Sequence, residues 1–167
     1  MKLGVLLFEG FELLDVFGPL EMFGQIDGLS IDMIAVEAGA IKSAQGPAVI
    51  AQEDISKNTN YEIILIPGGI GTRKEVEKID IMNWILVRSL KAKYIASVCT
   101  GSALLAKAGV LDGKKATTNK LAFSWVSSQG PNTNWIGKAR WVQDGNIFSS
   151  AGVSAGIDMS LALIEEI

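Results

Sequence analysis

The chemistry of this chain is most readily inferred at its single cysteine, Cys99. It lies where an apolar run, Tyr94 to Val98, gives way to a helix-like run, Ser102 to Ala108. A strand, a nucleophile and a helix in this order are typical of a nucleophile elbow, whose central residue has an uncommon backbone conformation. A thiol at the start of a helix also feels the positive end of the peptide dipoles, which favours the thiolate. The sequence therefore predicts a nucleophilic cysteine, and the alternative is a small buried apolar side chain.

A glycine-rich turn is expected beside this cysteine. The segment Pro67-Gly68-Gly69 directly follows the apolar run Ile63–Ile66, and the carboxyl ends of parallel strands bind ligands in such folds. The N–H groups of Gly68 and Gly69, together with that of Thr100, are predicted to stabilise an anion that develops above the thiol. For Pro-Gly-Gly on its own, a plain turn is the alternative.

Asp15 is the third candidate, because it follows the first apolar run, Leu3–Phe8, and so reaches the same side of the sheet. Its apolar neighbours between Leu13 and Phe17 are expected to desolvate the carboxylate, which raises its pKa and suits it to proton exchange. A helix cap or a solvated loop acid is the alternative. Three rival acids come from the same segment: Glu9, Glu12 and Glu21.

The composition excludes several classes of active site. The chain contains no histidine, so no Ser-His-Asp or Cys-His mechanism is possible within one chain. One cysteine cannot supply a thiolate cluster, and the commonest metal ligand is missing, so we expect no metal and no other cofactor. Proton transfer near neutral pH falls to a carboxylate, a lysine, the thiol or water.

Length and charge predict one globular domain over residues 1–167, with 49% hydrophobic residues and a net charge of -3. The scattered lysines and arginines form no basic patch, so we expect no binding to nucleic acid. The first apolar run is too short to span a bilayer and lacks a small-residue cleavage site, so no membrane association is expected. The single cysteine fits a reducing compartment, and we predict a cytoplasmic protein.

Short apolar runs alternate with helical patterns, which is typical of an α/β fold with a mostly parallel central sheet covered on both faces. Four buried strands are predicted, at Leu3–Phe8, Ile31–Val36, Ile63–Ile66 and Tyr94–Val98. In addition to the helix after Cys99, three helices are predicted, one opening near Pro19, one over Ile81–Ala92 and one from Ser154 to the end of the chain.

Two hairpins are also predicted. Ile41–Ser43 and Val49–Ala51 flank a Gln-Gly-Pro turn and are expected to pair outside the main sheet. Trp141–Gln143 and Asn146–Phe148 are separated by Asp144-Gly145, for which we expect the positive φ angles of a tight turn.

Five blocks in this order resemble the ThiJ/PfpI family of the class I glutamine amidotransferase-like superfamily. They are Leu14-Asp15-Val16-Phe17-Gly18-Pro19, Ile66-Pro67-Gly68-Gly69, Ser97-Val98-Cys99-Thr100-Gly101-Ser102, Ala116-Thr117-Thr118 and Ala155-Gly156-Ile157-Asp158. The resemblance spans almost the whole chain. It implies a flavodoxin-like three-layer α/β/α sandwich, and it implies a homodimer that acts on a small molecule.

Within that family the chain most resembles the isonitrile hydratases. The resemblance implies that Cys99 attacks the terminal carbon of R–N≡C and that Asp15 exchanges protons with the intermediate, giving an N-substituted formamide. Thr100 is expected to contribute to the same site. Gly101 and Asn119 are expected to line the pocket.

Departures from the wider family leave other functions open. Asn119 stands where many relatives have histidine, and an asparagine cannot act as a general base. Thr100 stands where the peptidase branch has histidine, which disfavours a peptidase. The alternatives are a glyoxalase or deglycase activity on α-oxoaldehydes, or a domain that senses ligands or redox state without turnover.

Overall fold

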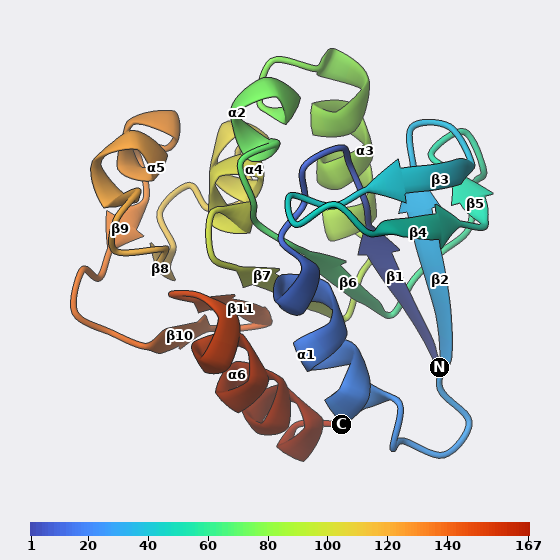
Figure 1. Cartoon of the computed structure of the whole chain (residues 1–167). Coiled ribbons are helices and arrows are strands. Elements are labelled where there is room, and N and C mark those ends of the chain that lie inside the picture. Colours follow the sequence, from blue (N-terminus) through green and yellow to red (C-terminus); the bar gives the residue numbers. More distant parts are fainter.

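A seven-stranded sheet forms the centre of the computed structural model, which describes residues 1–167 (Figure 1). The strand order is β10-β11-β7-β6-β1-β2-β5, and every neighbouring pair is parallel except β10 and β11. The strands are β1 (Lys2–Leu6), β2 (Ser30–Ala35), β5 (Glu53–Asp54), β6 (Ile63–Ile66), β7 (Tyr94–Val98), β10 (Trp141–Asp144) and β11 (Ile147–Ser150).

Helices cover both faces of this sheet. The helices α1 and α6 lie side by side on one face, and α3 and α4 pack on the other, so the three-layer prediction is confirmed (Figure 1). The helices are α1 (Leu13–Phe23), α2 (Thr72–Glu75), α3 (Ile79–Ser89), α4 (Gly101–Lys107), α5 (Phe123–Gln129) and α6 (Val153–Glu165). None of them combines the length and the apolar character needed to cross a membrane.

The inner strands are buried along their whole length, as the continuous apolar runs predict. Every residue of β6 and β7 is buried, and in β1 all residues after Lys2 are buried. A strand covered on both faces has no solvated side, so its residues are apolar throughout rather than alternating. The strand β1 ends at Leu6, two residues earlier than predicted, because the chain then turns through Gly10 toward α1.

The helix predicted to open near Pro19 begins six residues earlier. It starts at Leu13 and contains Pro19, although a proline inside a helix removes one backbone hydrogen bond. Burial of Val16 and Phe23 against the core on the same face outweighs that loss. The other two predicted helices are also shifted, by no more than three residues at either end.

Both predicted hairpins form. The strands β3 (Gly39–Lys42) and β4 (Ala48–Ala51) pair antiparallel outside the main sheet, and β8 (Lys115–Ala116) and β9 (Asn134–Trp135) form a second small sheet. In the β10–β11 hairpin Asp144 pairs with Ile147, so the turn lies one residue later than predicted, at Gly145-Asn146. Only Gly145 has a positive φ there, at 62°. Some two-residue turns need a positive φ at the first turn position only, and a glycine supplies it.

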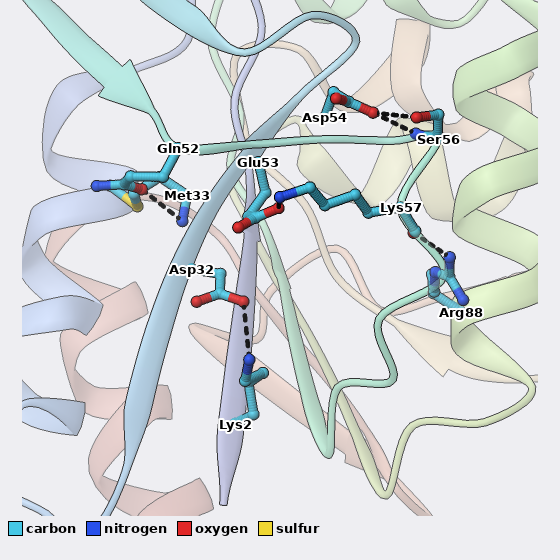
Figure 2. A network of polar contacts seen from close by, with 9 residues as sticks. All are labelled: Lys2, Asp32, Met33, Gln52, Glu53, Asp54, Ser56, Lys57 and Arg88. Atoms are coloured by element: carbon cyan, nitrogen blue, oxygen red, sulfur yellow. Dashed lines mark hydrogen bonds and ion pairs between the residues drawn. The ribbon is translucent and has the colours of Figure 1, made fainter.

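A polar network ties the β5 edge of the sheet to α3 (Figure 2). Arg88, which is buried at the end of α3, donates to the Lys57 carbonyl at 2.7 Å and to Asn58 Oδ1 at 3.0 Å. An ion pair between Lys2 and Asp32, at 3.3 Å, joins β1 to β2. Exposed ion pairs contribute little to stability, so the buried arginine is the stronger tie in this region. It joins the segment that follows β5 to the end of α3.

The start of α4 approaches β6 so closely that only glycine fits at position 101. A Cβ built on Gly101 would lie 2.2 Å from the Ile66 carbonyl oxygen, well inside van der Waals contact. We expect Gly101→Ala to lower the free energy of unfolding by about 3 kcal/mol, measured by denaturant titration. Gly137→Ala is the control, because its Cβ would meet nothing nearer than 3.7 Å. Equal stability of the two variants would contradict the close approach.

Candidate active site at the carboxyl ends of the strands

Cys99 occupies a strained turn between β7 and α4. Its φ of 55° is the only positive value at a residue other than glycine. Its backbone N–H donates to the Ser150 carbonyl at 3.0 Å, and its carbonyl accepts from the hydroxyls of Thr118 and Ser102 at 2.9 and 3.2 Å. These bonds hold the unfavourable conformation in place, which is the backbone geometry of a nucleophile elbow. The elbow predicted from the sequence is confirmed.

Two glycines allow the elbow to pack against the neighbouring turn. A Cβ on Gly68 would lie 2.8 Å from the Cys99 Cβ and 2.6 Å from the Thr100 nitrogen. Gly101 is buried against β6 and does not line the cavity at the cysteine, so its predicted place in the pocket is wrong. The absence of a side chain at this position serves packing instead, because a side chain there would collide with β6.

Asp15 lies fully buried in the first turn of α1, with its carboxylate at the elbow. The Gly68 N–H donates to its Oδ2 at 3.0 Å. Burial raises the pKa of Asp15 to about 7, and the nearby charge of Glu12 also raises this pKa. Hydrogen bonding by Gly68 and by the Cys99 thiol opposes this shift without cancelling it. The desolvation expected from the apolar neighbours of this carboxylate is therefore present.

The Cys99 thiol is not the preformed thiolate that its place before a helix suggests. Burial, and then the charge of Asp15, raise the pKa of Cys99 to about 12. The Thr100 N–H and the Asn119 side chain lower this pKa, but by less than the burial raises it. The dipoles of the short helix α4 are outweighed because desolvation and a buried carboxyl both disfavour a second negative charge. At neutral pH the nucleophile is a thiol beside an acid that titrates near 7.

The N–H groups of the glycine turn are already bound within the protein. The Gly68 N–H donates to Asp15, and the Gly69 N–H donates to Thr100 Oγ1 at 3.0 Å. The predicted anion hole is therefore corrected: these two groups position the acid and the threonine instead. The backbone N–H of Ile70 has no protein acceptor, and that of Thr100 donates to no protein oxygen and faces only the Cys99 sulfur. Ile70 was not foreseen, because no sequence signal distinguishes its N–H from those of the preceding glycines.

The Thr100 side chain joins the elbow to the turn that follows β6. Its Oγ1 accepts from the Gly69 N–H at 3.0 Å and lies 3.1 Å from the buried hydroxyl oxygen of Thr72. Its side chain is buried, while its N–H faces the sulfur of Cys99. The predicted contribution of Thr100 to the site is thus structural through the hydroxyl and electrostatic through the backbone.

Asn119 lies beside the cysteine as predicted. Its Oδ1 accepts from the N–H groups of Leu121 and Ala122, at 3.0 and 3.2 Å, which leaves Nδ2 free to interact with Cys99.

A cavity of about 250 Å³ opens above the sulfur. Its lining consists of Glu12, Gly69, Ile70, Arg73, Cys99, Thr100, Asn119, Leu121 and Ala122. No group of three or more histidine, cysteine or acidic side chains is arranged to hold a metal ion.

The chain is similar, over 90% or more of its length, to proteins named as two enzymes and a transcriptional regulator. It is 30% identical to isonitrile hydratase from Pseudomonas putida over 167 residues, which cover all of this chain and 72% of that protein. It is 28% identical to Deglycase TK1284 from Thermococcus kodakarensis, covering 90% of this chain and 89% of that protein. It is also 23% identical to the transcriptional regulator GbdR from Pseudomonas aeruginosa, of which it spans 46%.

The fold agrees with these relationships. A crystal structure of a ThiJ/PfpI family protein from Pseudomonas syringae superposes with a TM-score of 0.87 at 30% identity, covering 99% of this chain and 68% of that one. The sequence pattern of the DJ-1/PfpI family matches residues 1–166. The elbow, the parallel sheet and the match over the whole chain agree, and the chain belongs to the DJ-1/PfpI family, also written ThiJ/PfpI.

Proposed function

We propose that this protein hydrates a small isonitrile to an N-substituted formamide, with Cys99 as nucleophile and Asp15 as general acid and base. The observation that carries the proposal is the pairing of a protonated thiol with a buried carboxyl that titrates near pH 7. The similarity to isonitrile hydratase over the whole chain supports it. A base of this pKa is suited to take the thiol proton at the moment the sulfur attacks.

In the first step the sulfur attacks the terminal carbon of R–N≡C. The S–H bond breaks and its proton passes to the Asp15 carboxylate, while a C–S bond forms. Asp15 then protonates the same carbon, giving the thioformimidate R–N=CH–S. The Thr100 N–H, which donates to no protein oxygen and interacts with the sulfur, stabilises charge at that atom as it forms.

In the second step water adds to the carbon of the thioformimidate. The substrate nitrogen takes one proton of the water, which gives R–NH–CH(OH)–S. The C–S bond then breaks, and Asp15 carries the hydroxyl proton to the departing sulfur. The products are R–NH–CHO and the original thiol, so isonitrile plus water gives formamide with the enzyme unchanged.

A deglycase or glyoxalase activity is the second candidate. The match to a deglycase favours it, because a thiol and an acid can also add to the carbonyl of an α-oxoaldehyde. The absence of histidine weakens it, because Asn119 cannot act as a base.

A redox-sensing role is also disfavoured, because peroxides oxidise thiolates and Cys99 has a raised pKa. A ligand-sensing domain, a homodimer and a cytoplasmic location stay predictions.

The first test is multiple turnover of a simple alkyl isonitrile, with the formamide measured by chromatography. We expect Cys99→Ser and Asp15→Asn each to lower the rate by a factor of about 100 or more, because each removes a group that forms a bond or moves a proton. No formamide from well-folded wild type would rule out the hydratase, and α-oxoaldehydes would be tried next. Labelling of Cys99 once without turnover would indicate a sensor.

The second test is the dependence of kcat/KM on pH. Attack requires the form in which Cys99 and Asp15 together have lost one proton, and the first loss occurs at about pH 7. The rate should therefore rise about tenfold per pH unit below 7 and level off above it. Asp15→Asn should lack this rise around pH 7. A wild-type profile that is flat from pH 5 to about 8 contradicts the proposed proton carrier.

The third test follows from the stability cost of burying Asp15. Its pKa rises from 3.8 to about 7 on folding, so between these pH values the folded chain binds more protons than the unfolded chain. Stability must then fall as pH rises from about 4 to 7. Asp15→Asn, measured by urea unfolding, should gain up to about 4 kcal/mol over wild type between pH 4 and 8. Asp112→Asn, at an exposed site, should show no such gain.

A further inference from the structure

Two side chains of opposite charge line the cavity above Cys99 without pairing with each other. Glu12 lies at the start of α1 and Arg73 lies in α2, and both line this cavity. The four ion pairs of the protein involve neither of them. Because the two charges do not neutralise each other, both are available to a ligand, provided that other groups of the protein hold the two side chains in place.

Glu12 is held by the loop between β3 and β4. Gln45 Nε2 lies 2.9 Å from both carboxylate oxygens of Glu12, and Gln45 Oε1 accepts from the Leu13 N–H at 3.0 Å. The Ala44 N–H also donates to the Phe11 carbonyl at 2.8 Å, which fixes the loop to this segment. The amide supplies hydrogen bonds but no positive charge, so the negative charge of Glu12 is positioned and not neutralised.

Arg73 is held by an aromatic ring. Its guanidinium lies 4.6 Å from the centre of the Trp125 ring, a distance typical of a cation–π contact. The adjacent Thr72 is buried and donates to the Gly69 carbonyl at 2.7 Å, so α2 is anchored to the turn that packs against the elbow. A guanidinium stacked on a ring keeps its N–H donors at the edge of the group, and these can form two parallel bonds to a carboxylate.

The rest of the rim is apolar. Ile70 is 62% exposed and Leu121 is fully exposed, and both line the same cavity. Large apolar side chains at the mouth of a cavity suit the aliphatic part of a bound molecule. The cavity therefore offers an electrophile site at the sulfur, one negative and one positive charge, and an apolar rim.

We propose that the substrate of this site resembles an amino acid, with a carboxylate that binds Arg73 and a protonated amine that binds Glu12. This inference rests on the proposed function for the nature of the reacting carbon. The charges of the ligand follow from the two unpaired side chains alone, so binding can test them without turnover.

Four formamides, the products of the proposed reaction, separate the two charges. Nα-formyllysine carries both, Nα-formylnorleucine carries only the carboxylate, N-(5-aminopentyl)formamide carries only the ammonium, and N-pentylformamide carries neither. Dissociation constants for wild type are measured by calorimetry or NMR titration. We expect each charge to tighten binding about tenfold, with Nα-formyllysine the tightest, because each forms a charged hydrogen bond.

Two variants assign each preference to its side chain. Arg73→Gln should abolish the preference for the carboxylate and keep that for the ammonium, while Glu12→Gln should do the reverse. Lys74→Gln is the matched control, because this neighbour on α2 is exposed and does not line the cavity. Equal loss in the control, equal affinity for all four compounds, or no saturable binding of Nα-formyllysine at millimolar concentration overturns the inference.

The outcomes also distinguish this inference from the proposed function. Turnover of neutral isonitriles without any preference for charge contradicts the inference and leaves the hydratase standing. A preference for the doubly charged formamide, lost as expected in the two variants but without turnover of any isonitrile, supports the charge assignment and rejects the hydratase.

Discussion

The candidate site depends on how closely the Cys99 elbow packs against the turn that follows β6. Gly68 and Gly101 lie where any side chain would collide with the elbow or with the Ile66 carbonyl. Thr100 then bonds to the Gly69 N–H across the same gap. The Gly68 N–H also donates to Asp15. The contact between these two turns therefore positions the Cys99 sulfur, the Asp15 carboxyl and the Thr100 N–H together. A loosened contact would displace all three.

Burial gives this site its chemistry. Two acidic groups share a space with little water, so ionising one makes ionising the other costly. Burial, with a smaller contribution from the charge of Glu12, raises the pKa of Asp15 to about 7, and burial together with the charge of Asp15 raises the pKa of Cys99 to about 12. A protonated thiol beside a carboxyl that titrates near pH 7 suits the proposed addition reaction, which uses the proton of the nucleophile.

The same fold supports enzymes and a transcriptional regulator among the relatives of this chain, so the fold alone does not decide the activity. The cavity of this chain carries its own set of charged side chains. Glu12 and Arg73 come from different elements, and each is held by a partner far away in sequence, Gln45 and Trp125. The charges that we propose to bind the substrate are therefore positioned by loops and short helices above the carboxyl ends of the strands.

The sequence by itself determined the parts whose causes are local. Unbroken apolar runs identify the inner strands, because a doubly covered strand has no polar face, and a strand, Cys99 and a helix in succession identify the elbow. The apolar neighbours of Asp15 indicate its desolvation. Tertiary structure decided what depends on distant neighbours: packing that tolerates Pro19 inside α1, the acceptors that take the Gly68 and Gly69 N–H groups, and the burial and nearby carboxyl that raise the pKa of the thiol. These outcomes depend on distances across folded segments, which spacing along a chain does not contain.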